Sequence, residues 1–513
     1  MSEANANSTT TTTSSPAEEP GAWVKLRRTI FPIRGDEAKK FFLISAIKFY
    51  IILALTLTRD TKDTLVVTQC GAEAIAFLKI YGVLPAATAF IAFYSRMSDV
   101  LSKKTLFYAT CIPFFVFFGL FDLFIFSNTQ HLHPSLESVQ AWLPGEATSG
   151  GLAILAKIVA NWTSALFYIV AEIYSSVSVG ILFWQFANDV VPVDQAKRFY
   201  PLFAQVSGLA PVLAGQYVVR YTSKAKDFET SFHRLMSAVV FAGSMICLFY
   251  HLCTSYIERT EPQISLGGDG EKKSDKPKKP KMSMSESAQF LASSQYLRLI
   301  ATLVLGYGLS INFTEIMWKS LVKKQYPNPL DYQRFMGNFS SAVGLATCIV
   351  IFFGVQVIRV LGWRIGAVAT PTIMAALAAP FFACILMGID NPGRLKAAVV
   401  LGTIQSLLSK TSKYALFDPT TQMAYIPLDK ESKVKGKAAI DVLGSRIGKS
   451  GGSFIQQGLV FMFGNIISAA SVVAVIFYSV LITWFTAANR LSVLFHAQSE
   501  LNKAEEEDAK KNQ

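Results

Sequence analysis

The stretch Thr56-Leu-Thr-Arg-Asp-Thr-Lys-Asp-Thr-Leu-Val-Val-Thr68 places a cluster of charges between two apolar segments. The segment before it, 41–58, is apolar over a length that crosses a bilayer. If the stretch is helical, Arg59, Lys62 and Asp63 lie close to one face, at i, i+3 and i+4. Charges at membrane depth are costly, so they normally face a polar cavity and pair with one another or with a substrate. The alternative is an ordinary charged helix end whose side chains extend to the membrane interface.

The composition is that of a polytopic membrane protein. Of the 513 residues, 51% are hydrophobic and only 16% are charged, whereas soluble proteins carry about 25% charged residues. The six cysteines show no paired or metal-ligand spacing, so we expect neither disulfides nor a metal site. The net charge is +13. Part of it comes from the Lys and Arg that cytoplasmic loops favour, and part is suited to attracting an anion.

The lengths of the apolar segments predict an all-α fold of about twelve membrane-spanning helices. The expected spans are 41–58, 75–95, 105–127, 163–187, 200–219, 235–253, 297–317, 337–358, 366–389, 395–415, 438–462 and 467–488. Lys and Arg gather before the first span and in the even-numbered connections, while the connection at 128–150 has neither. Because cytoplasmic loops favour Lys and Arg, both termini are predicted to be cytoplasmic.

The polar segments divide the chain into two six-helix halves. We expect a disordered cytoplasmic tail at 1–40, an N-terminal half at 41–254, a Lys-rich cytoplasmic linker at 255–295, a C-terminal half at 296–489 and a cytoplasmic C-terminal tail at 490–513. The halves look related, because Val191-Pro-Val-Asp194 follows span four and Ile426-Pro-Leu-Asp429 follows span ten. Two halves with internal repeats predict a transporter whose site lies near the midplane, between them.

Several charged side chains lie within predicted spans. They are Glu172 in span four, Glu315 and Lys319 at the end of span seven, Lys410 and Lys413 on one face of span ten, and Asp441, Arg446 and Lys449 in span eleven. One interpretation is that they form buried salt bridges that fix helix packing. The excess of basic residues in the second half instead favours a cavity that binds an anion. Polyphosphate is a suitable anion, since Lys and Arg both bind phosphate.

The segment Gly444-Ser-Arg-Ile-Gly-Lys-Ser450 superficially matches a phosphate-binding P-loop. It has only three residues between the glycines, where the P-loop needs four, and its apolar surroundings leave no place for a preceding strand. Its glycines are better explained by close helix packing. We therefore expect a transporter and not an ATP-hydrolysing enzyme.

Four segments carry a specific resemblance to a known family. Leu57-Thr-Arg-Asp-Thr-Lys-Asp-Thr-Leu-Val-Val-Thr68, Gly71-Ala-Glu-Ala-Ile75, Leu182-Phe-Trp-Gln-Phe-Ala-Asn188 and Lys433-Val-Lys-Gly-Lys-Ala-Ala-Ile-Asp441 resemble the ATP/ADP translocases of plastids and obligate intracellular bacteria. The resemblance implies an arrangement similar to the major facilitator fold, exchange of external ATP for internal ADP, and phosphate travelling with ADP. It also implies roles for Lys62, Glu172, Glu315 and one lysine within 433–437.

Depth in the membrane and the resemblance together give a predicted substrate-binding set. Its members are Arg59, Lys62, Glu172, Asn312, Glu315, Lys410, Lys413, Lys435, Arg446 and Lys449. If the halves face each other, Glu172 is expected to approach Lys410 and Lys413 across a central cavity.

The N-terminal segment lacks the character of a plastid transit peptide. This favours a chlamydia-like member of the family, in a bacterial inner membrane, that takes up ATP from a host cell. The expected partners are ATP, ADP and phosphate as substrates and the lipid bilayer as surroundings, with no nucleic acid and no cofactor. The chain is expected to be a monomer.

Two other functions remain open from the sequence. The same fold could import GTP, UTP or CTP with protons, in which case uptake would depend on pH and Glu172 would be the carboxylate to suspect. An organic-anion or phosphate carrier belongs to another class, and competition by nucleotides would separate it.

Overall fold

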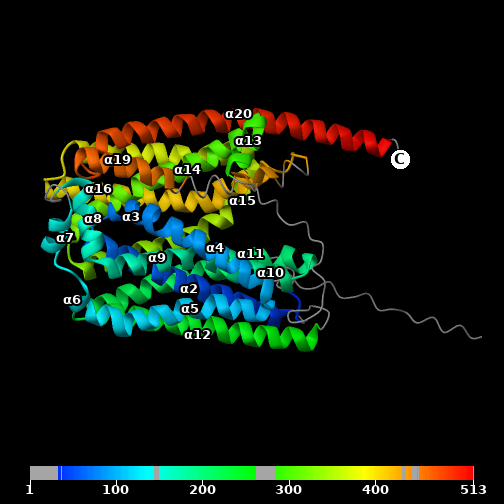
Figure 1. Ribbon diagram of the computed structural model, residues 1–513. Coiled ribbons are helices and arrows are strands. Elements are labelled where there is room, and N and C mark those ends of the chain that lie inside the picture. Colours follow the sequence, from blue (N-terminus) through cyan, green and yellow to red (C-terminus); the bar gives the residue numbers. More distant parts are fainter. Residues whose placement is uncertain are drawn as a thin grey trace, which may run out of the picture.

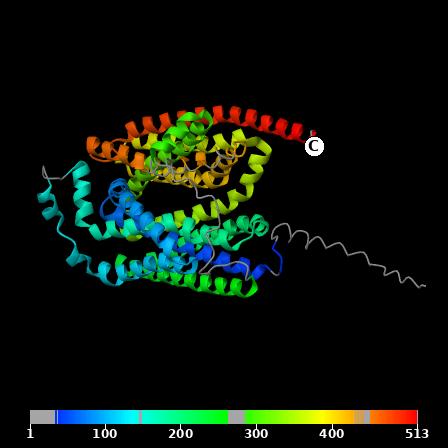
Figure 2. The same cartoon turned by 45° about the vertical axis from the view of Figure 1, so that its right-hand side comes forward.

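A computed structural model shows a bundle of long helices that run roughly along one axis (Figures 1 and 2). It describes residues 33–35, 37–143, 149–261, 284–429, 432, 435–437, 439–440, 448 and 450–511. In this part of the chain every regular element is a helix, and nine helices are long and apolar enough to cross a membrane. The predicted all-α, multispan architecture is therefore confirmed.

The N-terminal half contains α2 to α12. The elements are α2 (Ala38–Gln69), α3 (Ala74–Phe77), η1 (Leu78–Val83), α4 (Leu84–Val100), α5 (Lys103–Leu120), η2 (Phe121–Ile125), η3 (Phe126–Asn128), α6 (Thr129–Leu132), α7 (Leu136–Trp142), α8 (Gly150–Ala160), α9 (Trp162–Val177), η5 (Ser178–Gln185), α10 (Phe186–Val190), α11 (Val193–Arg220), η6 (Thr222–Lys224) and α12 (Phe228–Thr260). Several are consecutive pieces of one span, since η1 joins α3 to α4 and η5 joins α9 to α10.

The C-terminal half contains α13 to α20. The elements are α13 (Met284–Ser293), α14 (Gln295–Gln325), α15 (Pro329–Leu386), α16 (Pro392–Ser412), η7 (Lys413–Phe417), α17 (Asp418–Met423), α19 (Gly452–Phe463) and α20 (Ala470–Lys511). The element α15 covers two predicted spans, 337–358 and 366–389. It is divided at Gly362, whose φ of 83° lies in the left-handed region that glycine adopts without strain. The helix α20 continues as far as Lys511, through most of the expected C-terminal tail.

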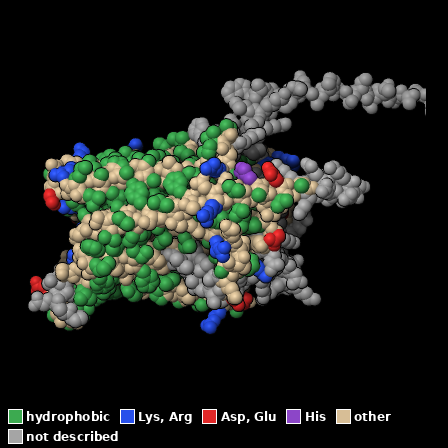
Figure 3. Space-filling model, turned by 90° about the horizontal axis from the view of Figure 1, so that it is seen from above, with side chains coloured by type: hydrophobic (Ala, Val, Ile, Leu, Met, Phe, Trp, Pro, Cys, Tyr) green, Lys and Arg blue, Asp and Glu red, His purple; other side chains and the backbone are tan. Residues whose placement is uncertain are grey.

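Hydrophobic side chains cover the middle of the surface seen in Figure 3, and most charged side chains there lie towards the two ends. Inside, one apolar core belongs to the N-terminal half and is rich in phenylalanine, as in the neighbouring rings of Phe121, Phe167 and Phe232. A second core centres on the C-terminal half and includes Trp318 and Trp484. Apolar outside and apolar inside is the pattern expected of a bundle in a bilayer.

The two halves are joined towards the end of the bundle that lies opposite the C-terminus. There α11 approaches α15 closely, because a Cβ atom on Gly215 would overlap the carbonyl oxygen of Gly337. Hydrogen bonds from Arg334 to Ser223 and from Gln457 to the carbonyl oxygen of Ala76 cross between the halves at the same end. This end therefore holds the halves together in the described conformation.

Candidate functional site

Six buried or half-buried charged side chains form one alternating chain of ion pairs between the helices. In order, they are Glu172, Lys62, Asp63, Lys319, Glu315 and Lys410. The helices α2 and α9 supply the first three, and α14 and α16 supply the last three. Three ammonium groups therefore face three carboxylates, and the set has no net formal charge. We call these six residues the central ion chain.

The shared contacts of the central ion chain are short. The ammonium of Lys62 lies 2.8 Å from Oδ1 of Asp63 and 3.1 Å from Oε2 of Glu172. The ring of Tyr168 also lies 4.1 Å from the Lys62 ammonium, in a cation–π contact. Lys62 is thus held from three sides within the N-terminal half.

One link of the central ion chain joins the two halves. Lys319 of α14 places its Nζ 2.8 Å from Oδ2 of Asp63 on α2. The same Nζ lies 3.1 Å from Oε1 of Glu315, and Lys410 lies 3.1 Å from that same oxygen. Asp63 therefore accepts one lysine from each half, and Glu315 accepts two lysines on one oxygen.

The middle of the central ion chain is buried, while its ends are more accessible. The side chains of Lys62, Asp63 and Lys319 are 5–7% exposed, whereas Glu172, Glu315 and Lys410 are 20–23% exposed. Buried charges are stable only when they are paired, and removing one partner leaves an uncompensated charge. An anion that reaches the accessible ends can offer the lysines another partner, which is the chemistry needed for reversible binding.

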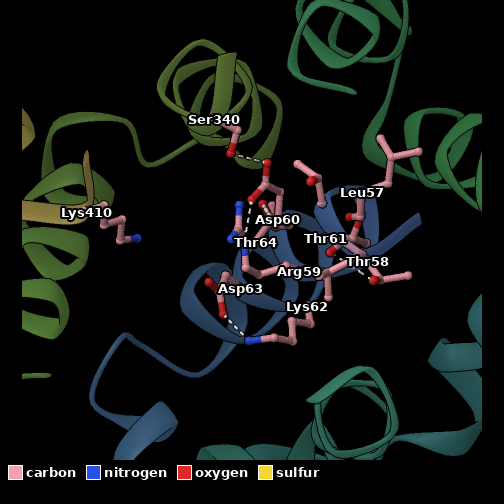
Figure 4. Close-up of polar contacts among 12 residues, drawn as sticks. Leu57, Thr58, Arg59, Asp60, Thr61, Lys62, Asp63, Thr64, Ser340 and Lys410 are labelled. Carbon is pink, nitrogen blue, oxygen red and sulfur yellow. Dashed lines mark hydrogen bonds and ion pairs between the residues drawn. The ribbon is translucent and has the colours of Figure 1, made fainter. Parts of the chain in front are cut away.

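The start of the charged stretch lies beside the central ion chain, as Figure 4 shows. The Nε of Arg59 lies 3.6 Å from Oδ1 of Asp60, and Ser340 of α15 donates a hydrogen bond of 2.5 Å to Oδ2 of Asp60. The Arg59 side chain is 41% exposed, and Lys410 points from α16 towards this face of α2. The threonines of the stretch bond back to their own helix, as in Thr61 to the carbonyl oxygen of Leu57.

The two lysines of span ten do not share one partner. The sequence predicts that Lys410 and Lys413 both approach Glu172, but Lys410 pairs with Glu315 and Lys413 lies 2.7 Å from Asp418. Neither lysine forms an ion pair with Glu172 among the described residues, because Glu315 of α14 and Asp418 take these contacts. Glu172 contacts Lys62 of its own half instead.

Asn312 joins three helices. Its Oδ1 accepts a hydrogen bond of 2.8 Å from Lys79 of η1, and its Nδ2 donates to the carbonyl oxygens of Gly308 and Gly448. Its backbone oxygen accepts a further bond from Gln456 of α19. Asn312 is therefore a junction between the halves, next to the central ion chain.

One predicted residue, Lys435, lies apart from this geometry, and two others are not described by the structure. Lys435 lines a pocket beside α13, together with Glu286 and Phe290. Arg446 and Lys449 lie outside the described residues. The structure thus brings together Lys62, Glu172, Glu315 and Lys410 of the predicted set, with Arg59 and Asn312 alongside.

Sequence reasoning left three residues of the site out of the predicted set. Asp63 and Lys319 are recognisable as charges near the predicted set, but only the fold shows that they link the two halves. Lys79 is a single charge within the second span, and depth in an apolar segment is the signal that could have identified it.

Comparison with known proteins identifies the fold first. A D-xylose–proton symporter matches 88% of this chain and 96% of its own, with a TM-score of 0.51 and 10% sequence identity. A bacterial homologue of the iron transporter ferroportin, in an inward-facing state, matches 91% of this chain and 100% of its own, with a TM-score of 0.50 and 12% identity. At such low identity these similarities support the predicted major-facilitator-like fold and nothing further.

The relatives found by sequence have a much higher identity to this chain than these solved structures. An ADP,ATP carrier protein 1 of Chlamydia muridarum is 42% identical over 94% of this chain and 93% of its own length. A chloroplastic ADP,ATP carrier protein 1 of Arabidopsis thaliana is 39% identical over 91% of this chain and 76% of its own. An ADP,ATP carrier protein 4 of Rickettsia conorii is 36% identical over 91% and 94%.

The family described as TLC ATP/ADP transporter matches residues 17–495. That description is of a carrier and not of an enzyme, in agreement with the prediction. The resemblance drawn from the four sequence segments is thereby confirmed, and the chain belongs to the TLC ATP/ADP transporter family.

Proposed function

We propose that this protein exchanges ATP for ADP across a membrane by alternating access of the two halves. The observation that carries the proposal is the central ion chain, which is neutral, buried in its middle and joined across the halves by Asp63 and Lys319. The relatives named as ADP,ATP carriers, at about 40% identity over almost the whole chain, support the choice of nucleotide.

The proposed binding step exchanges one set of contacts for another. The phosphates of a nucleotide approach the more accessible lysine, Lys410, and compete with Glu315 for its ammonium. Since Lys319 contacts the same oxygen of Glu315, the competition extends to the link between Lys319 and Asp63. Charge-assisted hydrogen bonds to phosphate are strong enough to replace those to carboxylate. Binding of the substrate therefore weakens the link that holds the halves together.

The same arrangement explains why the two halves of an empty carrier do not separate at the link between Asp63 and Lys319. Without a nucleotide, each lysine of the central ion chain has a carboxylate within 3.1 Å. Separating Asp63 from Lys319 would take one of two partners from each of these buried charges, leaving Asp63 with Lys62 and Lys319 with Glu315, and this costs free energy. A bound phosphate removes this cost, so movement of the halves is coupled to occupancy. Such coupling is the requirement for obligatory exchange.

We further propose the orientation and the setting. Lys and Arg concentrate in the connections that follow even-numbered spans, which supports a cytoplasmic position for both termini. The link at Asp63 and Lys319 then closes the external side, and the described conformation faces the cytoplasm. We propose a bacterial inner membrane as the location, phosphate as a companion of ADP, and a monomer as the working unit.

A reconstitution experiment tests the proposed function. The purified full-length chain is placed in lipid vesicles loaded with ADP, and uptake of labelled external ATP is followed. Uptake that requires internal ADP and is unaffected by a pH gradient is expected. Uptake into empty vesicles driven by a proton gradient, or stronger competition by GTP, UTP or CTP than by ATP, would contradict ATP/ADP exchange. Transport that organic anions inhibit and nucleotides do not would assign another class of carrier.

A further inference from the structure

Lys79 lies next to the central ion chain but outside it. It belongs to the π-helix η1 of the second span, and its Nζ donates a hydrogen bond of 2.8 Å to Oδ1 of Asn312 in the opposite half. Among the described residues no carboxylate lies within ion-pair distance of this ammonium. Arg59 and Lys413 differ in this respect, since each lies beside an aspartate of its own, Asp60 or Asp418.

The position of Lys79 is set by both halves. Its ammonium lies within electrostatic range of Glu172 in the N-terminal half and Glu315 in the C-terminal half, and also of Lys62 and Lys319, although none of the four contacts it directly. Its side chain is only partly buried, so a ligand can reach it. An ammonium has three donors, and Asn312 occupies one of them. Lys79 is therefore a positive charge near the central ion chain, with donors that Asn312 does not use.

Charge balance indicates what Lys79 could bind. The central ion chain has three lysines and three carboxylates, so a nucleotide that displaces carboxylates finds three cations there. ATP carries one phosphoryl group and one negative charge more than ADP. A site that binds ATP as well as ADP needs a further cation that can move to the additional phosphate. A phosphate oxygen is a stronger acceptor for an ammonium than the neutral amide of Asn312.

We propose that Lys79 binds the terminal phosphate of ATP and releases Asn312 when it does so, which makes it the residue that distinguishes ATP from ADP in this carrier. This inference rests on the proposed ATP/ADP exchange. Because Lys79 and Asn312 come from opposite halves, the transfer also removes a hydrogen bond between the halves only when ATP is bound. ADP, which lacks the third phosphate, leaves that bond in place.

The test is a comparison of the affinities for ATP and ADP on the purified full-length protein. Lys79→Gln removes the charge and keeps a donor for Asn312. Loss of one charged contact lowers affinity by about ten- to a hundred-fold, so we expect ATP binding to fall by that factor while ADP binding falls by less than about three-fold. Lys79→Arg keeps the charge and is expected to restore the preference for ATP. Lys157→Gln, which changes an exposed lysine of α8, is the matched control.

Two results would overturn the inference. If Lys79→Gln lowers the affinities for ATP and ADP by the same factor, Lys79 serves packing between the halves and not recognition of the third phosphate. If both affinities stay at the wild-type value, Lys79 contacts neither nucleotide. Lys79→Met, which keeps the apolar length of the side chain, gives the same comparison should the glutamine variant fail to fold. Wild-type protein that binds neither nucleotide would instead contradict the proposed function itself.

Discussion

The ion pairs of the central ion chain differ in construction from the ion pairs at the start of α2. At the centre, Asp63 and Glu315 each accept two lysines, and one link joins the halves. At the start of α2, Arg198 makes two hydrogen bonds of 2.6 and 2.8 Å to Glu37, and Lys40 lies 2.6 Å from Glu261. Both of these pairs stay within the N-terminal half.

The difference separates two uses of charge in one membrane protein. A charged side chain that contacts two opposite charges can exchange one of them for a new partner at small cost. The central ion chain is therefore suited to binding and movement. An isolated ion pair, in which each side chain has a single partner, fixes the position of two helices. The pair of Glu37 and Arg198 fixes the start of α2 against α11 in this way.

The largest effect is expected at Lys62, which holds two carboxylates. Lys62→Ala should nearly abolish ATP uptake, since loss of one contact to a charged group costs roughly 1.5–3 kcal/mol and Asp63 and Glu172 both lose a partner. Uptake into ADP-loaded vesicles is the measurement, with insertion and thermal stability checked on the same preparation. Near-normal transport by a well-folded variant would show that this lysine is not part of the substrate site.

A smaller and more selective effect is expected from Glu172→Gln. The substitution keeps shape and hydrogen bonding but removes a carboxylate that competes with phosphate for Lys62. Exchange should fall strongly, while ATP binding persists or becomes tighter. Binding and exchange are measured on the same purified protein. Loss of ATP binding in this variant would mean that Glu172 helps to bind the nucleotide and does not compete with it.

The two lysines of the tenth span should differ. Lys410 belongs to the central ion chain, whereas Lys413 pairs with Asp418 five residues further on and is itself 27% exposed. Lys410→Ala should therefore weaken ATP binding by about ten-fold or more, and Lys413→Ala should have a much smaller effect. Titration of both variants with ATP tests this. Equal losses would show that the π-helix turn does not separate the roles of the two residues.

The smallest effect concerns the pair at the end of the bundle. The hydrogen bonds from Arg198 lower the pKa of Glu37 below its usual value of about 4.3. A carboxylate with a lowered pKa contributes stability above its unfolded-state pKa, and this contribution is lost as the pH falls through the folded-state value. Wild-type protein should thus lose slightly more thermal stability than Glu37→Gln between neutral pH and about pH 3. Parallel profiles for the two proteins would contradict a stabilising role of the pair.

The helical spans could largely be predicted from the sequence, because the length of an apolar segment alone determines whether it crosses a bilayer. The exceptions have physical causes. The helix α8 has only 11 residues, too few for a membrane-length window, although it packs against the end of α19 through Gly151 and Phe461. Two expected spans form one element, α15, whose division depends on the backbone angle of Gly362.

The sequence predicts which residues belong to the site better than it predicts which of them pair with one another. Burial of a charge is costly wherever it occurs, so Glu172, Glu315 and Lys410 can be recognised from depth alone. Partners depend on how helices from both halves pack, and on the π-helix turns at Lys79 and Lys413. One residue more or less per turn changes the direction of every later side chain. Glu172 and Lys410 stand at opposite ends of the central ion chain and do not pair with each other.

The charge balance of the central ion chain has a consequence for transport across an energised membrane. An electric field acts on each charge that moves through it, at about 2.3 kcal/mol per elementary charge for every 100 mV. The three lysines and three carboxylates cancel, so their displacement as a group transfers no net charge. The voltage dependence of exchange then reports the charge difference between the nucleotides that cross in opposite directions, and not the rearrangement of this site.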